Sequence, residues 1–171
     1  MTQQQLTLTV AALFFLFLFF QIARLTKNIR KNAKLRRNIA SGKILSYADF
    51  EENWIITDSG KHGNSGYKYN DGPGCYVITV YSKNRRMNRK NYMKYENVYV
   101  GQSVHICQRV HNHFNGKGNG NVYADIKYGK SVYVRLVPCR RTQMNELEKE
   151  LIEAFHATAS YNETKGGGKK R

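Results

Sequence analysis

Apolar and polar residues are unevenly spread along the chain, and their pattern divides it into four parts. Residues 6–25 hold roughly 18 apolar or weakly polar residues, close to the ~20 that a helix needs to cross ~30 Å of hydrocarbon. A long polar stretch follows, basic at first and later rich in Gly, Asn and Ser, before apolar periodicity returns near Pro73. We therefore predict a membrane anchor, a basic juxtamembrane segment with a linker, one folded domain and a basic disordered tail, at residues 1–25, 26–72, 73–163 and 164–171.

Within the folded domain, patterns typical of strands and helices alternate. Segments rich in β-branched and aromatic residues predict three strands, at residues 74–81, 96–102 and 131–138. Apolar residues at helical spacing predict helices at 103–114 and 142–157, capped by Ser103 and Thr142, with a further short helix at 121–128. Residues 44–56 favour either a short helix or a strand packed on the core. The fold class is therefore α/β, a small three-stranded antiparallel or mixed sheet flanked by helices and preceded by an N-terminal transmembrane helix.

The charges around the apolar run distinguish an uncleaved anchor from a secretory signal. A signal peptide would place positive charge before the run and small residues at its end. Here residues 1–5 are uncharged, and the exit at residues 21–24 is a poor cleavage site. We predict an uncleaved single-pass anchor. Eight Lys and Arg residues and no acidic residue follow between Arg24 and Lys43, so the positive-inside rule places the rest of the chain in the cytoplasm.

Composition limits the classes of molecule that the protein is expected to bind. Lys and Arg number 28 against 12 Asp and Glu, which gives a net charge of +16. Such a charge suits nucleic acid or an anionic membrane surface. The basic run 24–43 could capture DNA near the membrane. The favoured interpretation is that it sets the membrane topology and contacts anionic lipid headgroups. The three cysteines are widely spaced, without a CxxC pair, so we expect buried thiols in a reducing compartment and no zinc site.

Two tripeptides and four later polar residues carry the candidate chemistry. Gly74-Cys75-Tyr76 opens the first predicted strand, Tyr99-Val100-Gly101 closes the second, and Arg109, His113, Glu148 and Asn162 follow in order. In this order they resemble the GIY-YIG nuclease family over about residues 73–162. Cys75 and Val100 replace isoleucines of the family motifs, and both are apolar exchanges that a buried strand accepts. The resemblance implies a metal-dependent enzyme that hydrolyses DNA phosphodiester bonds, with Mg²⁺ or Mn²⁺ as the cofactor.

Arg109 and His113 stand four residues apart, so one face of a helix presents both side chains. A guanidinium stabilises the negative charge that develops on phosphate oxygens during cleavage, and Arg109 is the candidate for that role. His113 is either a general base or a hydrogen-bond partner that orients a tyrosine, and the sequence leaves both roles open.

The resemblance assigns the remaining site residues. It implies that Glu148 is the metal-binding carboxylate, with water and substrate phosphate completing the shell of a magnesium ion. Glu146, Glu150 and Glu153 lie on the same predicted helix, and the family motif alone selects Glu148. Of Tyr76 and Tyr99, one is implied to help activate the attacking water and the other to orient water or phosphate, with the division left open. Asn162 is implied to brace the site through hydrogen bonds.

The segment between the two tripeptides is a candidate nucleic-acid contact. Arg85, Arg86, Arg89 and Lys90 are interleaved with Tyr92 and Tyr95, a mixture that suits phosphate contacts with base stacking. A plain exposed basic loop is the alternative. The glycine-rich residues 115–121 lack the P-loop pattern, so no nucleotide site is predicted there.

Together these features predict a membrane-anchored endonuclease that faces the cytoplasm and cuts DNA with little sequence specificity. Cleavage of incoming foreign DNA is the leading hypothesis for its biological role. The alternative is a homing or mobility-type endonuclease, which would serve the uptake, transfer or mobility of DNA instead of its destruction. The main alternative is a membrane-tethered nucleic-acid-binding protein on a catalytically retired nuclease fold. A secreted scavenging nuclease is a third interpretation, which the uncharged start and the unpaired cysteines oppose.

Overall fold

The computed structural model describes residues 2–58, 71–163 and 166, and the chain divides after Lys34 into two compact units. Each unit is described by itself. The predicted tail, apart from Gly166, and residues 59–70 of the predicted linker lie outside the described residues.

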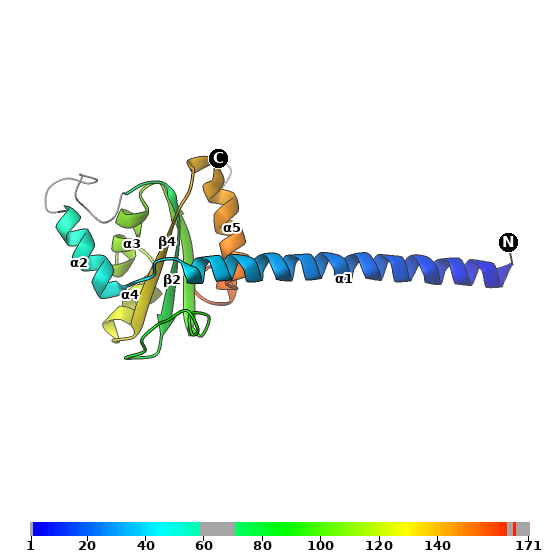
Figure 1. The fold of residues 1–171 in the computed structure, drawn as a ribbon, viewed down its shortest axis with the longest axis horizontal. Helices are drawn as coiled ribbons and strands as arrows, with labels where there is room; N and C mark the ends of the chain where they lie inside the picture. Colours follow the sequence, from blue (N-terminus) through cyan, green and yellow to red (C-terminus); the bar gives the residue numbers. More distant parts are fainter. Residues whose placement is uncertain (1, 59–70, 164–165, 167–171) are drawn as a thin grey trace. The chain divides into compact units, whose positions relative to one another are not determined.

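One long helix, α1, spans Gln3–Ser41 (Figure 1). No Gly or Pro occurs before Gly42, so the sequence contains no strong helix breaker until that point. The large apolar side chains from Leu13 to Phe20 are exposed. Among the described residues, α1 alone is long and apolar enough to cross a membrane, by a test of length and composition that a signal sequence also passes. The predicted apolar N-terminal helix is therefore present.

The second unit is built on a four-stranded antiparallel sheet, in the order β1-β4-β2-β3. Strands β2 (Gly74–Tyr81), β3 (Asn97–Ser103) and β4 (Ser131–Pro138) match the three strands expected from the sequence. The prediction of three strands was wrong, because β1 (Leu45–Ser46) pairs with β4 through Leu45↔Val134. Two residues are too few to show the alternation of a strand in the sequence, so β1 is recognised only by its pairing with β4.

Helices cover both faces of the sheet, which explains why all eight residues of β2 are buried (Figure 1). On one face Tyr76, Ile78 and Val80 pack against residues of α2 (Tyr47–Asp58), α3 (Ile106–Phe114) and α4 (Gly120–Lys127). On the other face Cys75 and Val77 pack against the end of α1 and α5 (Met144–Ala154). Successive side chains of a strand point to opposite faces, so β2 is the shared centre of two apolar layers.

The boundaries of two predicted helices differ from those in the structure. Ser103 is the last residue of β3, and α3 begins at Ile106, where Asp71 Oδ1 accepts the N–H of Cys107 at 2.8 Å. Short 3-10 turns at Arg141–Gln143 and Ala157–Ala159 flank α5 and replace the ends of the longer helix predicted there.

Residues before Pro73 also contribute to the core. The stretch 44–56 forms β1 and then most of α2, so both expectations for it are met in part. Phe50 of α2 is fully buried and packs edge-on against Phe114 of α3, with ring centroids 5.5 Å apart. The folded unit therefore includes side chains that precede the sheet's central strand.

We expect Phe50→Ala to lower the free energy of unfolding by about 3–5 kcal/mol, because it removes a fully buried aromatic ring and leaves a cavity. Urea unfolding of the full chain in detergent measures this. Glu52→Ala, an exposed position on the same helix, is the matched control and should change it by less than about 0.5 kcal/mol. Equal stability of both variants would show that α2 is not part of the core.

Candidate active site

An open polar cavity of about 480 Å³ lies where β3, α3 and α5 meet the turn before α4. Its lining includes five of the six site residues expected from the sequence, namely Tyr99, Arg109, His113, Glu148 and Asn162. Tyr76, the sixth, is 1% exposed, and its hydroxyl contacts His113 at the buried side of the site. The structure thus brings all six together, although Tyr76 and Asn162 are 86 positions apart in the sequence.

His113 joins the turn before α4 to Tyr76. The backbone N–H of Asn119 donates to His113 Nδ1 at 2.6 Å, and His113 Nε2 lies 2.8 Å from Tyr76 Oη. A backbone amide can only donate, so Nδ1 must carry a lone pair and no hydrogen. The neutral ring then has its hydrogen on Nε2, and this N–H donates to the tyrosine oxygen.

Burial keeps His113 in this neutral form. Its side chain is fully buried, and burial, with the nearby Arg109 charge in a smaller part, lowers the pKa of His113 to about 4. Its only lone pair on nitrogen is already used by Asn119. Of the two roles that the sequence left open, this geometry favours a partner that orients Tyr76 over a general base.

Two glycines make room for this arrangement. A Cβ atom on Gly101 would overlap the hydroxyl of Tyr76, and one on Gly118 would overlap Nδ1 of His113. Gly101 is the cross-strand partner of Tyr76, so the last residue of the second tripeptide leaves space for the last residue of the first.

Arg109 lies beside both tyrosines and faces the cavity. Burial raises the pKa of the Tyr76 phenol and of the Tyr99 phenol above the ordinary value, while the Arg109 charge acts on both in the opposite direction. The Tyr99 ring also packs edge-on against His113, with centroids 4.8 Å apart. Both tyrosines are therefore neutral donors at neutral pH in the protein alone.

Glu148 is oriented by Gln102, a residue that the sequence analysis missed. Gln102 Nε2 donates to Glu148 Oε2 at 2.9 Å and to Asn145 Oδ1 at 2.7 Å. Gln102 directly follows the second tripeptide, and this adjacency is the signal that could have found it. A carboxylate held in this way, in an open polar cavity, suits a magnesium ion that takes its other ligands from water and phosphate. Among the described residues, no group of three His, Cys, Asp or Glu side chains could hold a metal alone.

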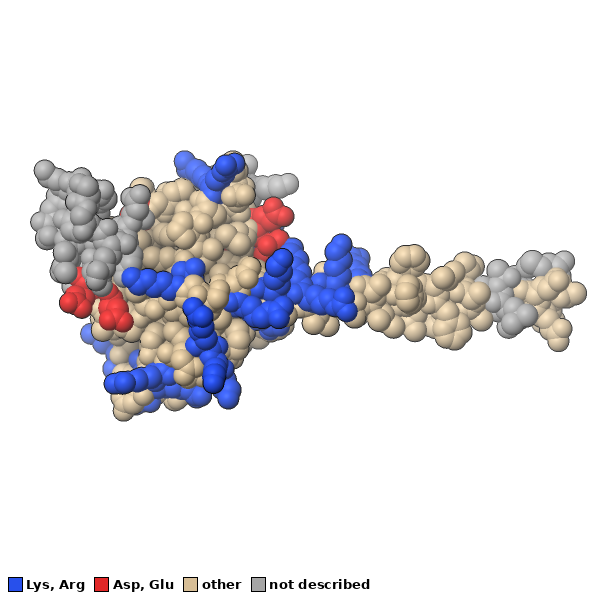
Figure 2. Space-filling model, viewed as in Figure 1, with Lys and Arg blue, Asp and Glu red and all other residues tan. Residues whose placement is uncertain are grey.

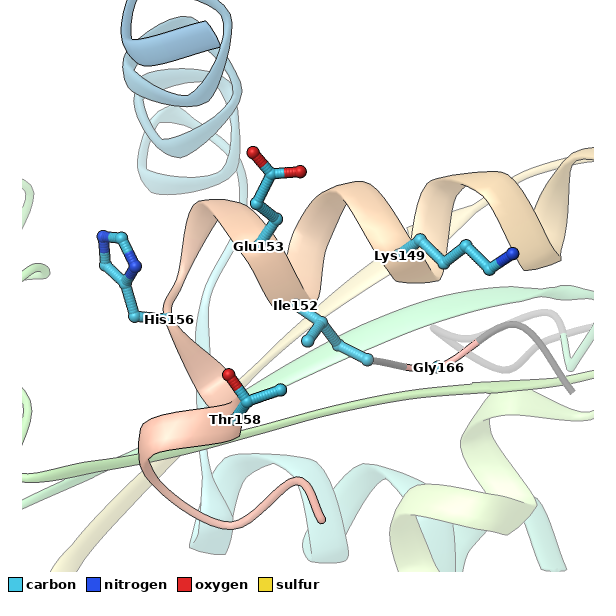
Figure 3. A pocket seen from close by; sticks show the side chains of 6 residues that line it. All are labelled: Lys149, Ile152, Glu153, His156, Thr158 and Gly166. Atoms are coloured by element: carbon cyan, nitrogen blue, oxygen red, sulfur yellow. The ribbon is translucent and has the colours of Figure 1, made fainter. Parts of the chain in front are cut away.

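The other glutamates of α5 stand apart from this cavity. Glu153 lines a second pocket of about 640 Å³, together with Lys149, His156 and Thr158 (Figure 3). Among the described residues, the linings of the two pockets share Gly166 alone, and the second pocket contains none of the expected site residues. Glu148 therefore lies at the candidate site and Glu153 does not, in agreement with the choice of Glu148 from the family motif.

Asn162 completes one wall of the cavity by pairing with the edge of β3. Its Oδ1 accepts the N–H of Val100 at 2.9 Å, and its Nδ2 donates to the Val100 carbonyl at 2.8 Å. The preceding Tyr161 donates its hydroxyl hydrogen to Asp125 of α4 at 2.5 Å. Nothing in the sequence marks Tyr161 or Asp125, because the two are far apart in the chain and belong to no motif.

The basic residues predicted to contact nucleic acid do not lie at the cavity. Arg85, Arg86, Arg89 and Lys90 belong to the loop that follows Tyr81. Tyr76 is five residues before that end of β2, which corresponds to about 17 Å along the strand.

The comparisons with known proteins agree with this geometry. Residues 73–162, just over half of the 171, match the family model described as the GIY-YIG catalytic domain. No curated protein and no solved structure gives a significant match. The matched range contains all six residues that converge on the cavity.

We expect His113→Gln to retain phosphodiester cleavage within about tenfold of the wild type, whereas His113→Leu loses about 10²–10⁴-fold. A glutamine can accept from Asn119 with its oxygen and donate to Tyr76 with its nitrogen, as the neutral imidazole does. Initial rates of the full-chain variants, at equal folded fraction by circular dichroism, measure this. Equal losses in both variants would instead indicate that His113 is a general base.

Proposed function

We propose that this chain, which belongs to the GIY-YIG nuclease family, is a membrane-anchored endonuclease that uses a divalent metal ion to hydrolyse DNA. The observation that carries the proposal is the convergence of Arg109, Glu148, Tyr99 and the His113–Tyr76 pair on one open polar cavity. Phosphodiester cleavage needs charge stabilisation and a positioned nucleophile, and this set of side chains can supply both.

Glu148 is the residue that would hold Mg²⁺ or Mn²⁺. Its Oε2 already accepts a hydrogen bond from Gln102, which fixes the direction of the carboxylate. The ion, when bound, supplies charge neutralisation at the phosphate and favours ionisation of nearby water.

Arg109 stabilises the phosphate oxygens as negative charge develops, because its guanidinium faces the same cavity as Glu148. The Tyr76 oxygen receives the His113 N–H, so the Tyr76 hydrogen points elsewhere, and the neighbouring Tyr99 hydroxyl is placed to accept it. Tyr99 offers a second hydroxyl at the same wall. In the protein alone burial keeps each phenol protonated, so Tyr99 can donate to the reactants while Tyr76, through its hydroxyl, orients Tyr99. A nearby divalent cation would shift both phenols toward the ionised form.

Helix α1 is the proposed anchor, with the nuclease unit facing the cytoplasm. Its length and composition, and the eight cations between Arg24 and Lys43, support this orientation. An anchored nuclease would meet DNA as it enters the cell, so cleavage of incoming foreign DNA is the proposed biological role. A role in DNA transfer or mobility would use the same chemistry.

The first test is cleavage of plasmid and single-stranded DNA by the full chain in detergent, with and without Mg²⁺ or Mn²⁺. We expect metal-dependent cutting, reduced about 10²–10³-fold by Arg109→Ala and at least as much by Glu148→Gln. Glu146→Gln, an exposed position two residues earlier on α5, is the matched control and should cut normally.

DNA binding by the same proteins separates the enzyme from a retired fold. Uncut DNA, bound equally well by the wild type and both variants, would contradict the enzyme and favour a membrane-tethered binding protein.

A second test concerns Gln102. We expect Gln102→Leu to raise the metal concentration needed for half-maximal cleavage about 10–100-fold, because the Glu148 carboxylate loses the donor that orients it. The rate at saturating metal should change much less. Asn145→Ala removes the other partner of Gln102 and serves as the control. A fall in the saturated rate with an unchanged metal requirement would contradict this role.

A further inference from the structure

A strongly basic surface lies at the end of the sheet away from the cavity. Residues 35–48 and 82–95 contain nine Lys and Arg residues and no acidic residue: Arg36, Arg37, Lys43, Lys83, Arg85, Arg86, Arg89, Lys90 and Lys94. Figure 2 shows basic side chains gathered where Figure 1 draws the green loop after β2 and the end of α1. We refer to these nine residues as the basic face.

The loop of the basic face is fixed against the end of α1. Tyr92 is fully buried, in the same apolar cluster as Ile39 of α1. Arg89 Nη2 donates to the Ser41 carbonyl at 3.2 Å. The Tyr92 carbonyl in turn accepts the hydroxyl hydrogen of Tyr81 at 2.6 Å. The cations of the loop are thus presented by a packed segment that holds them beside those of α1.

The loop cations of the basic face are separated from the cavity along the strands, and Lys43 is separated from it across the sheet. Its loop is about 17 Å from Tyr76 along β2. Across the sheet, Lys43 lies on the side of β1, where its carbonyl accepts a hydrogen bond from Arg135 of β4 at 3.0 Å. The cavity lies at β3, the opposite edge of the same sheet.

The tyrosines of the loop do not serve base stacking. Tyr92 is 0% exposed, and the half-buried Tyr95 donates its hydroxyl hydrogen to the Phe155 carbonyl at 2.8 Å. The stacking expected from the sequence is therefore contradicted at Tyr92 and disfavoured at Tyr95. What remains exposed is charge without aromatic rings, which suits a layer of anionic headgroups better than single-stranded DNA.

We propose that the basic face, including the loop cations Arg85, Arg86, Arg89 and Lys90, binds anionic phospholipid headgroups and turns the cavity away from the bilayer. This proposal rests on the membrane anchoring of α1 proposed above. An anchored unit stays near the bilayer, so weak contacts act at a high effective concentration. Because the cavity lies at the other end of β2 from the loop cations, the bound orientation leaves it open to DNA.

Lysine footprinting of the full chain tests this. The protein is inserted into nanodiscs of phosphatidylcholine, with or without phosphatidylglycerol, and acetylation of each lysine is followed by mass spectrometry. We expect acetylation of Lys90 and Lys94 to slow about fivefold in the anionic nanodiscs only, and to recover in high salt. Lys117 and Lys127, exposed residues in the turn before α4 and in α4, are the controls and should not change.

Other outcomes would overturn the proposal. Equal acetylation in both lipids would exclude headgroup contact, and protection by duplex DNA without protection by anionic lipid would assign the basic face to nucleic acid. Co-elution with the nanodiscs is measured separately, so a chain that fails to insert would contradict the anchor, and this proposal with it. None of these readouts depends on catalysis.

The double variant Arg86→Glu with Lys90→Glu provides a second measurement. Both side chains are exposed and outside the cavity, so DNA cleavage in neutral nanodiscs should be unchanged. We expect the variant to lose the lipid-dependent protection of Lys94. Protection that persists in the variant would exclude the loop cations from the lipid contact.

Discussion

The hydrogen bond from the Asn119 backbone to His113 Nδ1 fixes the tautomer of His113, and the proposed chemistry of the site depends on it. It fixes the imidazole as a donor to Tyr76, and burial prevents water from reversing that choice. The bond depends on the close approach of Gly118, where any larger residue would overlap the ring. A turn between two helices, which carries no catalytic side chain of its own, thus decides what the histidine can do.

The other site residues are positioned by the same antiparallel sheet. Strand β3 carries Tyr99 and Gln102, while its exposed edge pairs with Asn162. Gln102 then directs Glu148 from the helix that covers one face, and Arg109 projects from the helix that covers the other. Separate hydrogen bonds set the directions of His113, Glu148 and Asn162. The loop cations of the basic face lie at the other end of β2 from Tyr76, and under our two proposals this keeps substrate contact apart from membrane contact.

The sequence predicted much of this arrangement and missed specific parts for physical reasons. The β-branched and aromatic content predicted three strands, and helical periodicity predicted the main helices. The two tripeptides singled out Tyr76 and Tyr99 among 12 tyrosines. Strand β1 was missed because two residues show no alternation. The role of Asn119 was missed because it acts through a backbone N–H, which leaves no mark in a sequence. Tyr92 was misinterpreted because an aromatic residue in a basic loop has the same pattern whether its ring is buried or exposed.

The most direct test of the account is the protonation state of His113, read from long-range ¹H–¹⁵N spectra of the full chain labelled at histidine. We predict a neutral ring with hydrogen on Nε2 and none on Nδ1 at neutral pH. The ring should stay in that form well below the usual titration range of histidine, because its pKa is lowered to about 4. A hydrogen on Nδ1, or an imidazolium at neutral pH, would contradict the orientation of Tyr76 by His113 and return the histidine to the role of a base.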